Sequence, residues 1–216
     1  MQKGKSQEDF WSLFITNFSA ERLQIYLKLS DGLPQKAQAL YLWNAKTSSA
    51  LWEVIGYLEI SLRTAIDRQL AVLSSTPDWL DDPSIIRSTD SLRTLISKAK
   101  SQASVYGRAP SHHQILEQLP LGFLQALLSK KYLHLWPSLA AGFLGARRGN
   151  HSEISKLVKA LRKLRNRIGH HNHLLDLDLE LEFANLLRIA HLIDPRLRRF
   201  FEIESGVTTP NLKRPS

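Results

Sequence analysis

Apolar residues recur at three- and four-residue steps through most of the segment from Lys36 to about Leu73, and this spacing limits the fold more than any other feature. Side chains at this spacing share one face of an α-helix, whereas a half-buried strand needs strict alternation. Strand signals are scarce elsewhere, so we predict an all-α protein. Polar residues from Asn44 to Ser49 favour a break that would divide this segment into two helices. The recurring apolar positions are Leu40, Leu51, Val54, Ile55, Leu58, Leu62 and Ile66.

Residue types that start or end helices divide the flanking parts of the chain. Ser19 can cap a helix, and Gly32 followed by Pro34 would end it. The segment 74–83, which contains prolines and aspartates, is typical of a polar connection, after which a helix resumes near Ser91. We therefore expect a short helical hairpin ahead of the long apolar segment.

The second half of the chain contains a further apolar run. A loop is predicted at 107–111, and the run that follows it is interrupted at Pro120. With 216 residues the chain can bury a core as one domain, 1–216. We expect an N-terminal helical part at about 1–75 and a second helical part at about 110–200. The apolar run comprises Ile115, Leu116, Leu119, Leu121, Phe123, Leu124, Leu127 and Leu128.

The chain is basic, with 29 lysines and arginines against 20 acidic residues, a formal net charge of +9 and a pI near 9.9. Such a charge favours a polyanionic partner, and nucleic acid is the first candidate. General solubility is the alternative, since net charge alone says little about partners. The absence of cysteine excludes disulfides, thiolate zinc sites and a cysteine nucleophile. The basic residues concentrate at Arg147, Arg148, Lys156, Lys159, Arg162, Lys163, Arg165, Arg167, Arg196, Arg198 and Arg199.

The sequence shows neither a membrane span nor a secretory signal. Its first residues turn acidic and aromatic before an apolar run develops. No segment reaches the roughly 18 uninterrupted apolar residues that a spanning helix needs. We expect a soluble protein in the cytoplasm, with no membrane partner.

A basic amphipathic helix is predicted to start near His151, because Asn150 and Glu153 have capping-box spacing. Its apolar residues form one stripe at about 100° per residue. Arg165 falls within that stripe, four residues after Leu161. Burying a guanidinium is costly unless it is paired or faces a ligand, so Arg165 either forms an ion pair inside the fold or faces a cleft. The stripe consists of Ile154, Leu157, Val158, Leu161, Leu164 and Ile168.

Three histidines follow this helix, namely His170, His171 and His173. Five steps of continuous helix would rotate His170 by roughly 140° away from Arg165. Gly169 could resolve this conflict by taking the left-handed conformation that ends helices, which would turn His170 back towards the arginine. A metal site is an alternative use of the histidines, but their spacing matches no common zinc pattern. We therefore expect neither a metal nor a cofactor.

The run from Leu164 to His171 combines residue types that suit phosphodiester chemistry. Arginine offers a planar fork of donors that matches a phosphate, and the ordinary pKa of histidine lets it exchange protons near neutrality. The run resembles the R-x4-H signature of the HEPN superfamily, with Arg165, Asn166 and His170 at the motif positions. The segments that look like the Abi-like proteins of bacterial abortive infection are 18–27, 39–70, 119–136 and 157–171.

This resemblance implies a HEPN-like helical bundle, usually a homodimer, in which two copies of the motif face each other and cut RNA without a metal. His170 would abstract or donate the proton at the ribose 2′-hydroxyl or at the leaving oxygen. Arg165 would hold the scissile phosphate and stabilise its growing charge. Asn166 would orient His170 or the phosphate. An RNA or protein antitoxin is a further implied partner.

Other residues are expected to support this site. Glu59 and Arg63 match a family segment that often carries E-x-x-x-R followed by asparagine, although Thr64 stands in the asparagine position here. A simple ion pair within one helix is the alternative. After the motif, many members continue with histidine, glutamate and proline, whereas here Asn172 follows the supporting residue His171, so any role of that glutamate is absent. The predicted RNA-binding residues are Arg162, Lys163 and Arg167.

Three functions remain open from the sequence. The first is a metal-independent endoribonuclease of the toxin or antiphage-defence type. The second is a non-catalytic HEPN-like RNA-binding or interaction module, in which Arg165 and His170 only bind phosphate or form the dimer interface. The third is DNA-directed regulation, which the lack of a helix-turn-helix pair with a short glycine turn disfavours.

Overall fold

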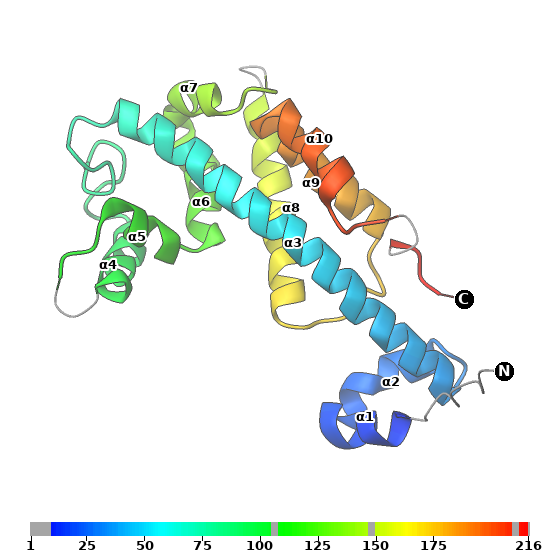
Figure 1. Cartoon of the computed structure of the whole chain (residues 1–216). Coiled ribbons are helices and arrows are strands. Elements are labelled where there is room, and N and C mark those ends of the chain that lie inside the picture. Colours follow the sequence, from blue (N-terminus) through cyan, green and yellow to red (C-terminus); the bar gives the residue numbers. More distant parts are fainter. Residues whose placement is uncertain (1–9, 105–107, 147–149, 209–211, 216) are drawn as a thin grey trace.

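The computed structural model describes residues 10–104, 108–146, 150–208 and 212–215. Within these residues the fold is all-α and has no strand, which confirms the predicted fold class. Helix α3 runs through the molecule, with α1 and α2 at its N-terminal end and α4 and α5 beside its C-terminal part (Figure 1). The elements are α1 (Trp11–Phe18), α2 (Ala20–Lys28), α3 (Pro34–Leu73), α4 (Ser91–Ala103), α5 (His112–Gln118), α6 (Leu121–Leu127), the 3-10 helix η1 (Lys130–Leu135), α7 (Trp136–Leu139), the 3-10 helix η2 (Ala140–Gly142), α8 (His151–Gly169), α9 (Leu179–Ile193) and α10 (Pro195–Glu204).

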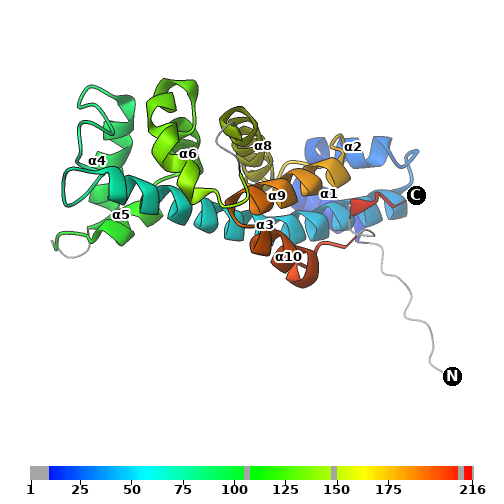
Figure 2. The ribbon, with the colours of Figure 1, turned by 90° about the horizontal axis from the view of Figure 1, so that it is seen from above.

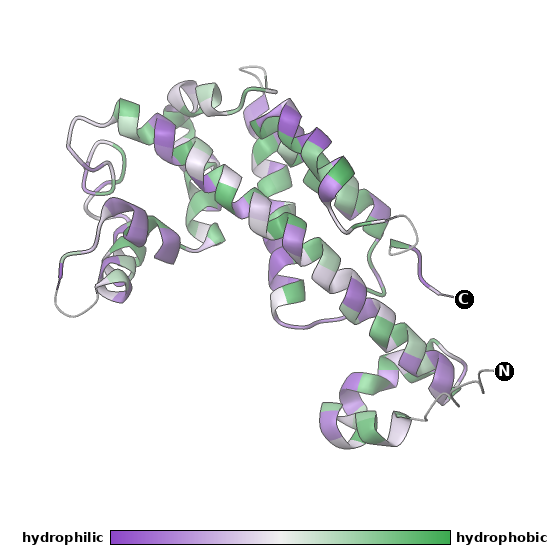
Figure 3. Ribbon diagram, viewed as in Figure 1, coloured by the Kyte–Doolittle hydropathy of each residue, from purple (hydrophilic) through white to green (hydrophobic). Residues whose placement is uncertain are grey.

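Helix α3 is continuous over 40 residues, so the break predicted between Asn44 and Ser49 is wrong. Asn44 is compatible with the helix because its side-chain oxygen accepts a hydrogen bond from the distant N–H of Leu174 (2.7 Å) and does not compete for its own backbone. Hydrophilic and hydrophobic residues are both distributed along the whole helix (Figure 3). Other helices pack around it, with α6 and α8 on one side and α10 on the other (Figure 2).

Two apolar clusters lie along α3. The smaller one packs α1 and α2 against the N-terminal end of α3, and the larger one surrounds the rest of α3 and extends into α8 and α9. Trp43 packs against both clusters. Helix α3 therefore joins the two parts of the core. The buried residues of the smaller cluster are Trp11, Phe14, Leu23, Tyr26, Ala37 and Leu40.

Helix ends that were predicted from short-range signals are confirmed. The hydroxyl of Ser19 caps α2, and Gly32, with φ of +76°, precedes the start of α3. Helix α4 starts at Ser91 with the side chain of Asp90 as its cap, and Pro120 separates α5 from α6. Part of the loop predicted at 107–111, and the basic residues at 147 and 148, lie outside the described residues.

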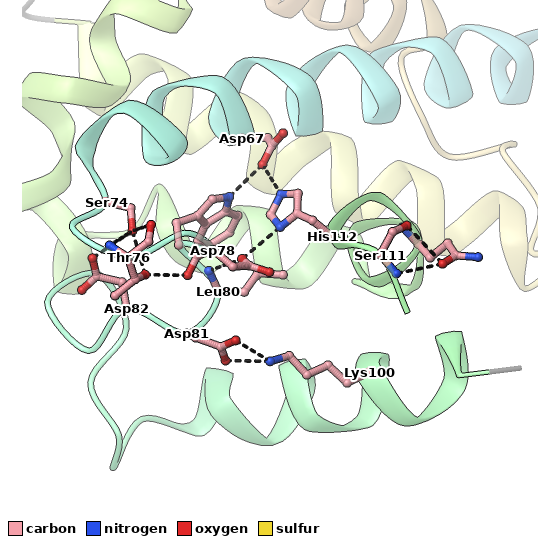
Figure 4. A network of polar contacts seen from close by, with 12 residues as sticks. Asp67, Ser74, Thr76, Asp78, Leu80, Asp81, Asp82, Lys100, Ser111 and His112 are labelled. Carbon is pink, nitrogen blue, oxygen red and sulfur yellow. Dashed lines mark hydrogen bonds and ion pairs between the residues drawn. The ribbon is translucent and has the colours of Figure 1, made fainter. Parts of the chain in front are cut away.

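The polar connection between α3 and α4 is organised by one carboxylate. Asp82 is only 1% exposed and accepts hydrogen bonds of 2.6–3.1 Å from Ser84, Ser75 and Ser74. These bonds, the strongest from Ser84, hold the pKa of Asp82 well below its ordinary range. Figure 4 shows Asp82 beside Ser74 at the end of α3. These hydrogen bonds fix the conformation of the connection at the end of α3.

His112 joins α5 to the C-terminal end of α3 (Figure 4). Its Nε2 lies 2.7 Å from Oδ1 of Asp67, and its Nδ1 lies 2.9 Å from Oδ1 of Asp78. The indole N–H of Trp79 donates to the same oxygen of Asp67 (2.7 Å). Partial burial alone would lower the pKa of His112, but the hydrogen bonds and charges of Asp67 and Asp78 outweigh burial and raise it above 6.5. Only the charged imidazole can donate to both carboxylates at once.

Candidate functional site

Helix α8 is amphipathic, as predicted. It starts at His151, and its apolar stripe is buried except for Leu157, which is partly buried against the core. The predicted capping box is wrong in detail: the side chain of Asn150 donates to the carboxylate of Glu153 and accepts no capping hydrogen bond from a backbone N–H of the first helical turn. Glu153 also accepts from Arg188 of α9 (2.6 Å), and this bond in particular lowers the pKa of Glu153.

Arg165 lies at the contact between α8 and α3. Its Nε is buried and lies 3.8 Å from a carboxylate oxygen of Glu59. The centre of its guanidinium lies 5.3 Å from the middle of the Trp52 ring, in cation–π geometry. The side chain is nevertheless 39% exposed. Arg165 therefore meets both of the alternatives predicted for it: its Nε pairs with Glu59 inside the fold, and part of its side chain is exposed at the surface.

Glu59 holds two arginines. Its second carboxylate oxygen accepts a hydrogen bond from Arg63 (3.2 Å), which also donates to the carbonyl of Leu119 (3.2 Å). The side chains of Glu59 and Arg63 are only 18% and 16% exposed. The structure thus brings the two predicted supporting residues of α3 to Arg165, and Glu59 lies between the two guanidinium groups.

The end of α8 differs from the prediction. The helix continues through Gly169, and His171, not the glycine, takes the left-handed conformation, with φ of +56°. The N–H of His171 donates to the carbonyl of Ile168 (2.8 Å), and the N–H of Asn172 donates to the carbonyl of Arg167 (2.9 Å). This pair of bonds is the Schellman motif, moved two residues beyond the position expected for it.

As a consequence, the motif residues face two different hollows at the end of α8. Arg165 and His171 line a cleft of about 1060 Å³, which we call the aromatic cleft. Asn166 and His170 line a second hollow of about 780 Å³ on another face of the helix. The prediction that Gly169 turns His170 towards Arg165 is wrong, because five residues of continuous helix separate the two side chains by roughly 140°.

The predicted RNA-binding residues differ in their surroundings. Lys163 is exposed beside the second hollow, and Arg162 is exposed with its guanidinium 3.0 Å from the side-chain oxygen of Gln125. Arg167 is used by the fold, since it donates to the carbonyl of His173 (2.5 Å) and pairs with Asp176. Arg167 thereby holds the loop after α8. Within the described residues, no group of three or more histidines and carboxylates is arranged to hold a metal ion.

The aromatic cleft contains residues that the sequence analysis missed. Arg22 of α2 donates to the carbonyl of His171, across 149 positions of sequence. Asn44 and Trp52 of α3 line the same cleft. Burial, with a contribution from the nearby Tyr41, raises the pKa of Tyr26 to about 12, so this phenol stays neutral. No local signal marks these residues, because they are far from the motif in sequence and share the cleft with it only in the folded chain.

Fold and site together define an all-helical protein in which a basic helix presents an arginine and a histidine next to two hollows. A family model described as Abi-like protein matches residues 10–176, which include α1 to α8 and both of these residues. The chain therefore belongs to the Abi-like protein family. No curated protein and no solved structure matches the chain. Among the described helices, none is both long and apolar enough to cross a membrane.

Proposed function

We propose that this Abi-like protein is a metal-independent endoribonuclease of abortive infection, with a HEPN-type site formed by two copies of the chain. Arg165 is the observation that carries the proposal. Trp52 and Glu59 hold its guanidinium in place while 39% of the side chain remains exposed at a cleft. A guanidinium that served only an internal ion pair would not need this exposure, whereas one that binds a phosphate does.

The chemistry requires a proton acceptor and a proton donor at the phosphate. In the proposed reaction, His170 of one copy removes the proton of the ribose 2′-hydroxyl, and the 2′-oxygen attacks phosphorus. The bond to the 5′-oxygen breaks, and that oxygen takes up the proton that His170 removed, which leaves a 2′,3′-cyclic phosphate and a 5′-hydroxyl. Arg165 of the other copy stabilises the charge that develops on the phosphate oxygens. Asn166, beside His170 in the second hollow, orients the histidine.

A site shared by two copies is supported by the separation of Arg165 and His170. In one chain they line different hollows, so a single chain does not bring both to one phosphate. In a two-fold symmetric dimer, the same helix end can supply the arginine to one site and the histidine to the other. The same separation also favours the second candidate, a module that binds RNA without cutting it.

The first experiment is cleavage of total and transfer RNA by purified protein in EDTA. We expect the wild type to cut, and Arg165→Ala and His170→Ala to lose at least about a hundredfold in rate, the usual size of such effects. Arg68→Ala and His113→Ala are the matched controls, because both residues are exposed and lie outside the site. Binding of RNA without cleavage by any form would favour the binding module.

Mixing the two inactive variants tests the shared site. Random pairing puts about half of the chains in mixed dimers, and each mixed dimer has one of its two sites intact. We therefore expect Arg165→Ala mixed with His170→Ala to recover about one quarter of the wild-type rate. A mixture that forms dimers but stays inactive would contradict a site built from Arg165 of one copy and His170 of the other.

A further inference from the structure

The aromatic cleft has the composition of a site for an unpaired nucleotide. Four aromatic side chains contribute to its lining, namely Phe18, Tyr26, Tyr41 and Trp52. Two arginines line it as well, and no carboxylate is among the described lining residues. Its volume of about 1060 Å³ is at the upper end of the range for small-molecule sites, so a base with its sugar and phosphate would fit.

Two of the rings are exposed at this cleft. Phe18 is 40% exposed and Trp52 is 42% exposed, although both side chains are large and apolar. Phe18 stacks on Tyr41 with nearly parallel planes, 9° apart, and ring centres 5.5 Å apart. Trp52 is held by the guanidinium of Arg165. Rings that are fixed in orientation and open to solvent are the usual platforms on which single-stranded bases stack.

The two arginines of the cleft are also fixed in place. Glu59 and Trp52 orient Arg165, and the carbonyl of His171 accepts a hydrogen bond from Arg22. A guanidinium carries five N–H donors, more than these contacts use. Fixed guanidinium groups beside aromatic rings can bind the phosphate of a nucleotide whose base lies on a ring. The hydroxyls of Ser48 and Ser49 line the same cleft and can meet the polar edge of a base.

We infer that the aromatic cleft binds one unpaired nucleotide of single-stranded RNA, with its base against Trp52 and Phe18 and its phosphate against Arg22 and Arg165. A base inside a duplex is stacked on its neighbours and cannot enter such a cleft, so the cleft selects unpaired RNA. This inference rests on the proposed function in one respect, the choice of RNA as the polymer, and it does not require that the RNA is cleaved. It places the substrate strand on the N-terminal helices α1 to α3 as well as on α8.

The test is binding of a labelled single-stranded RNA, measured by fluorescence anisotropy with the full-length chain carrying His170→Ala to prevent cutting. The comparison ligands are a duplex of the same sequence and a strand of the same length whose central nucleotides lack bases. The variants are Trp52→Leu, Phe18→Leu and Trp52→Phe. The control is Tyr57→Leu, since Tyr57 is also on α3 and is 44% exposed but does not line the cleft. Thermal midpoints confirm that each variant is folded.

We expect Trp52→Leu and Phe18→Leu each to raise the Kd for the single strand by about five- to 150-fold, the usual effect of losing one stacked base. Trp52→Phe should lose less, and Tyr57→Leu should bind as the parent does. The duplex and the strand without bases should bind weakly to all forms. If the loss of Trp52 also disturbs Arg165, the Phe18→Leu variant still tests whether a base stacks in the cleft.

Equal Kd values for the parent and both leucine variants would overturn the inference, as would equal binding of the strand with and without bases. Failure of the parent to bind single-stranded RNA would overturn it as well. The cleavage assay in EDTA separates this result from the proposed function. If RNA binding depends on the rings but the wild type does not cleave RNA, the proposed nuclease function is refuted and the inference about the cleft stands. If Trp52→Leu and Phe18→Leu cleave RNA at the wild-type rate, the nuclease proposal stands and the inference about the cleft is refuted.

Discussion

Replacing Asn44 with alanine should destabilise the protein by about 1–3 kcal/mol, which is the cost of leaving one buried N–H without a partner. The side chain of Asn44 is only 8% exposed, and its oxygen accepts the N–H of Leu174 at 2.7 Å. Leu174 itself is fully buried, so water cannot replace the lost acceptor. For a chain of this length, the loss corresponds to a fall in Tm of roughly 2–12 °C.

The assay is urea unfolding followed by circular dichroism, with the free energy of unfolding taken from the midpoint and slope. The midpoint should fall while the slope stays the same, because the native fold is kept. Asn172→Ala is the matched control, since Asn172 is an exposed asparagine in the same loop. We expect it to change the free energy of unfolding by less than about 0.5 kcal/mol.

A result for Asn44→Ala that equals the result for Asn172→Ala would refute the reasoning. It would mean that the loop after α8 does not depend on α3 for its position, although the two are joined by a bond across 130 positions of sequence. The same variant is informative for RNA cleavage. A displaced loop would disturb the helix end that carries His170 and His171.

Two further predictions concern other parts of the fold. His112→Gln should lower the free energy of unfolding most at acid pH. Because the pKa of His112 is raised in the folded state, its contribution to stability is complete below pH 6.5 and is lost as pH rises through that higher pKa. The free energies of unfolding of wild type and variant, measured in urea, should therefore converge at alkaline pH, and a difference that stays constant with pH would contradict a charged His112. Gly145→Ala should prevent folding or greatly lower Tm, because its methyl group would lie 1.8 Å from the carbonyl oxygen of His191. In Gly56→Ala, on α3, the added methyl group meets no atom within 4 Å, so this control should stabilise the protein by about 0.5–1 kcal/mol. Equal Tm values for the two variants would contradict this prediction.

The parts of the fold that could be predicted are those whose causes are local. The cap at Ser19, the turn at Gly32 and the start of α4 at Ser91 each depend on a few neighbouring residues. The buried stripe of α8 follows from the helical repeat alone. The continuity of α3 could not be predicted in this way, because Asn44 favours a break in isolation and is compatible with a helix only when Leu174 lies beside it.

The same distinction applies to the candidate site. The position of Arg165 at a helix contact follows from its place in the apolar stripe, and the structure agrees with it. The direction of His170 depended on which residue ends α8. Glycine is the common choice, but here His171 takes the left-handed conformation, and Arg22 donates to its carbonyl. The partner that accompanies this choice lies in α2, so the sequence around the motif does not reveal it.

The N-terminal helices therefore determine what the motif can do. Arg22 contacts the carbonyl of His171, Asn44 contacts the backbone of Leu174, and Glu59 pairs with Arg165, so the orientation of the whole segment depends on α2 and α3. A six-residue motif match cannot by itself distinguish a nuclease from an RNA-binding module, since both need the arginine at a cleft. Under the proposed function, the difference lies in whether a second copy brings His170 to the phosphate that Arg165 would hold. Under the two proposals together, one chain would be sufficient to bind an unpaired nucleotide, and cutting would require two.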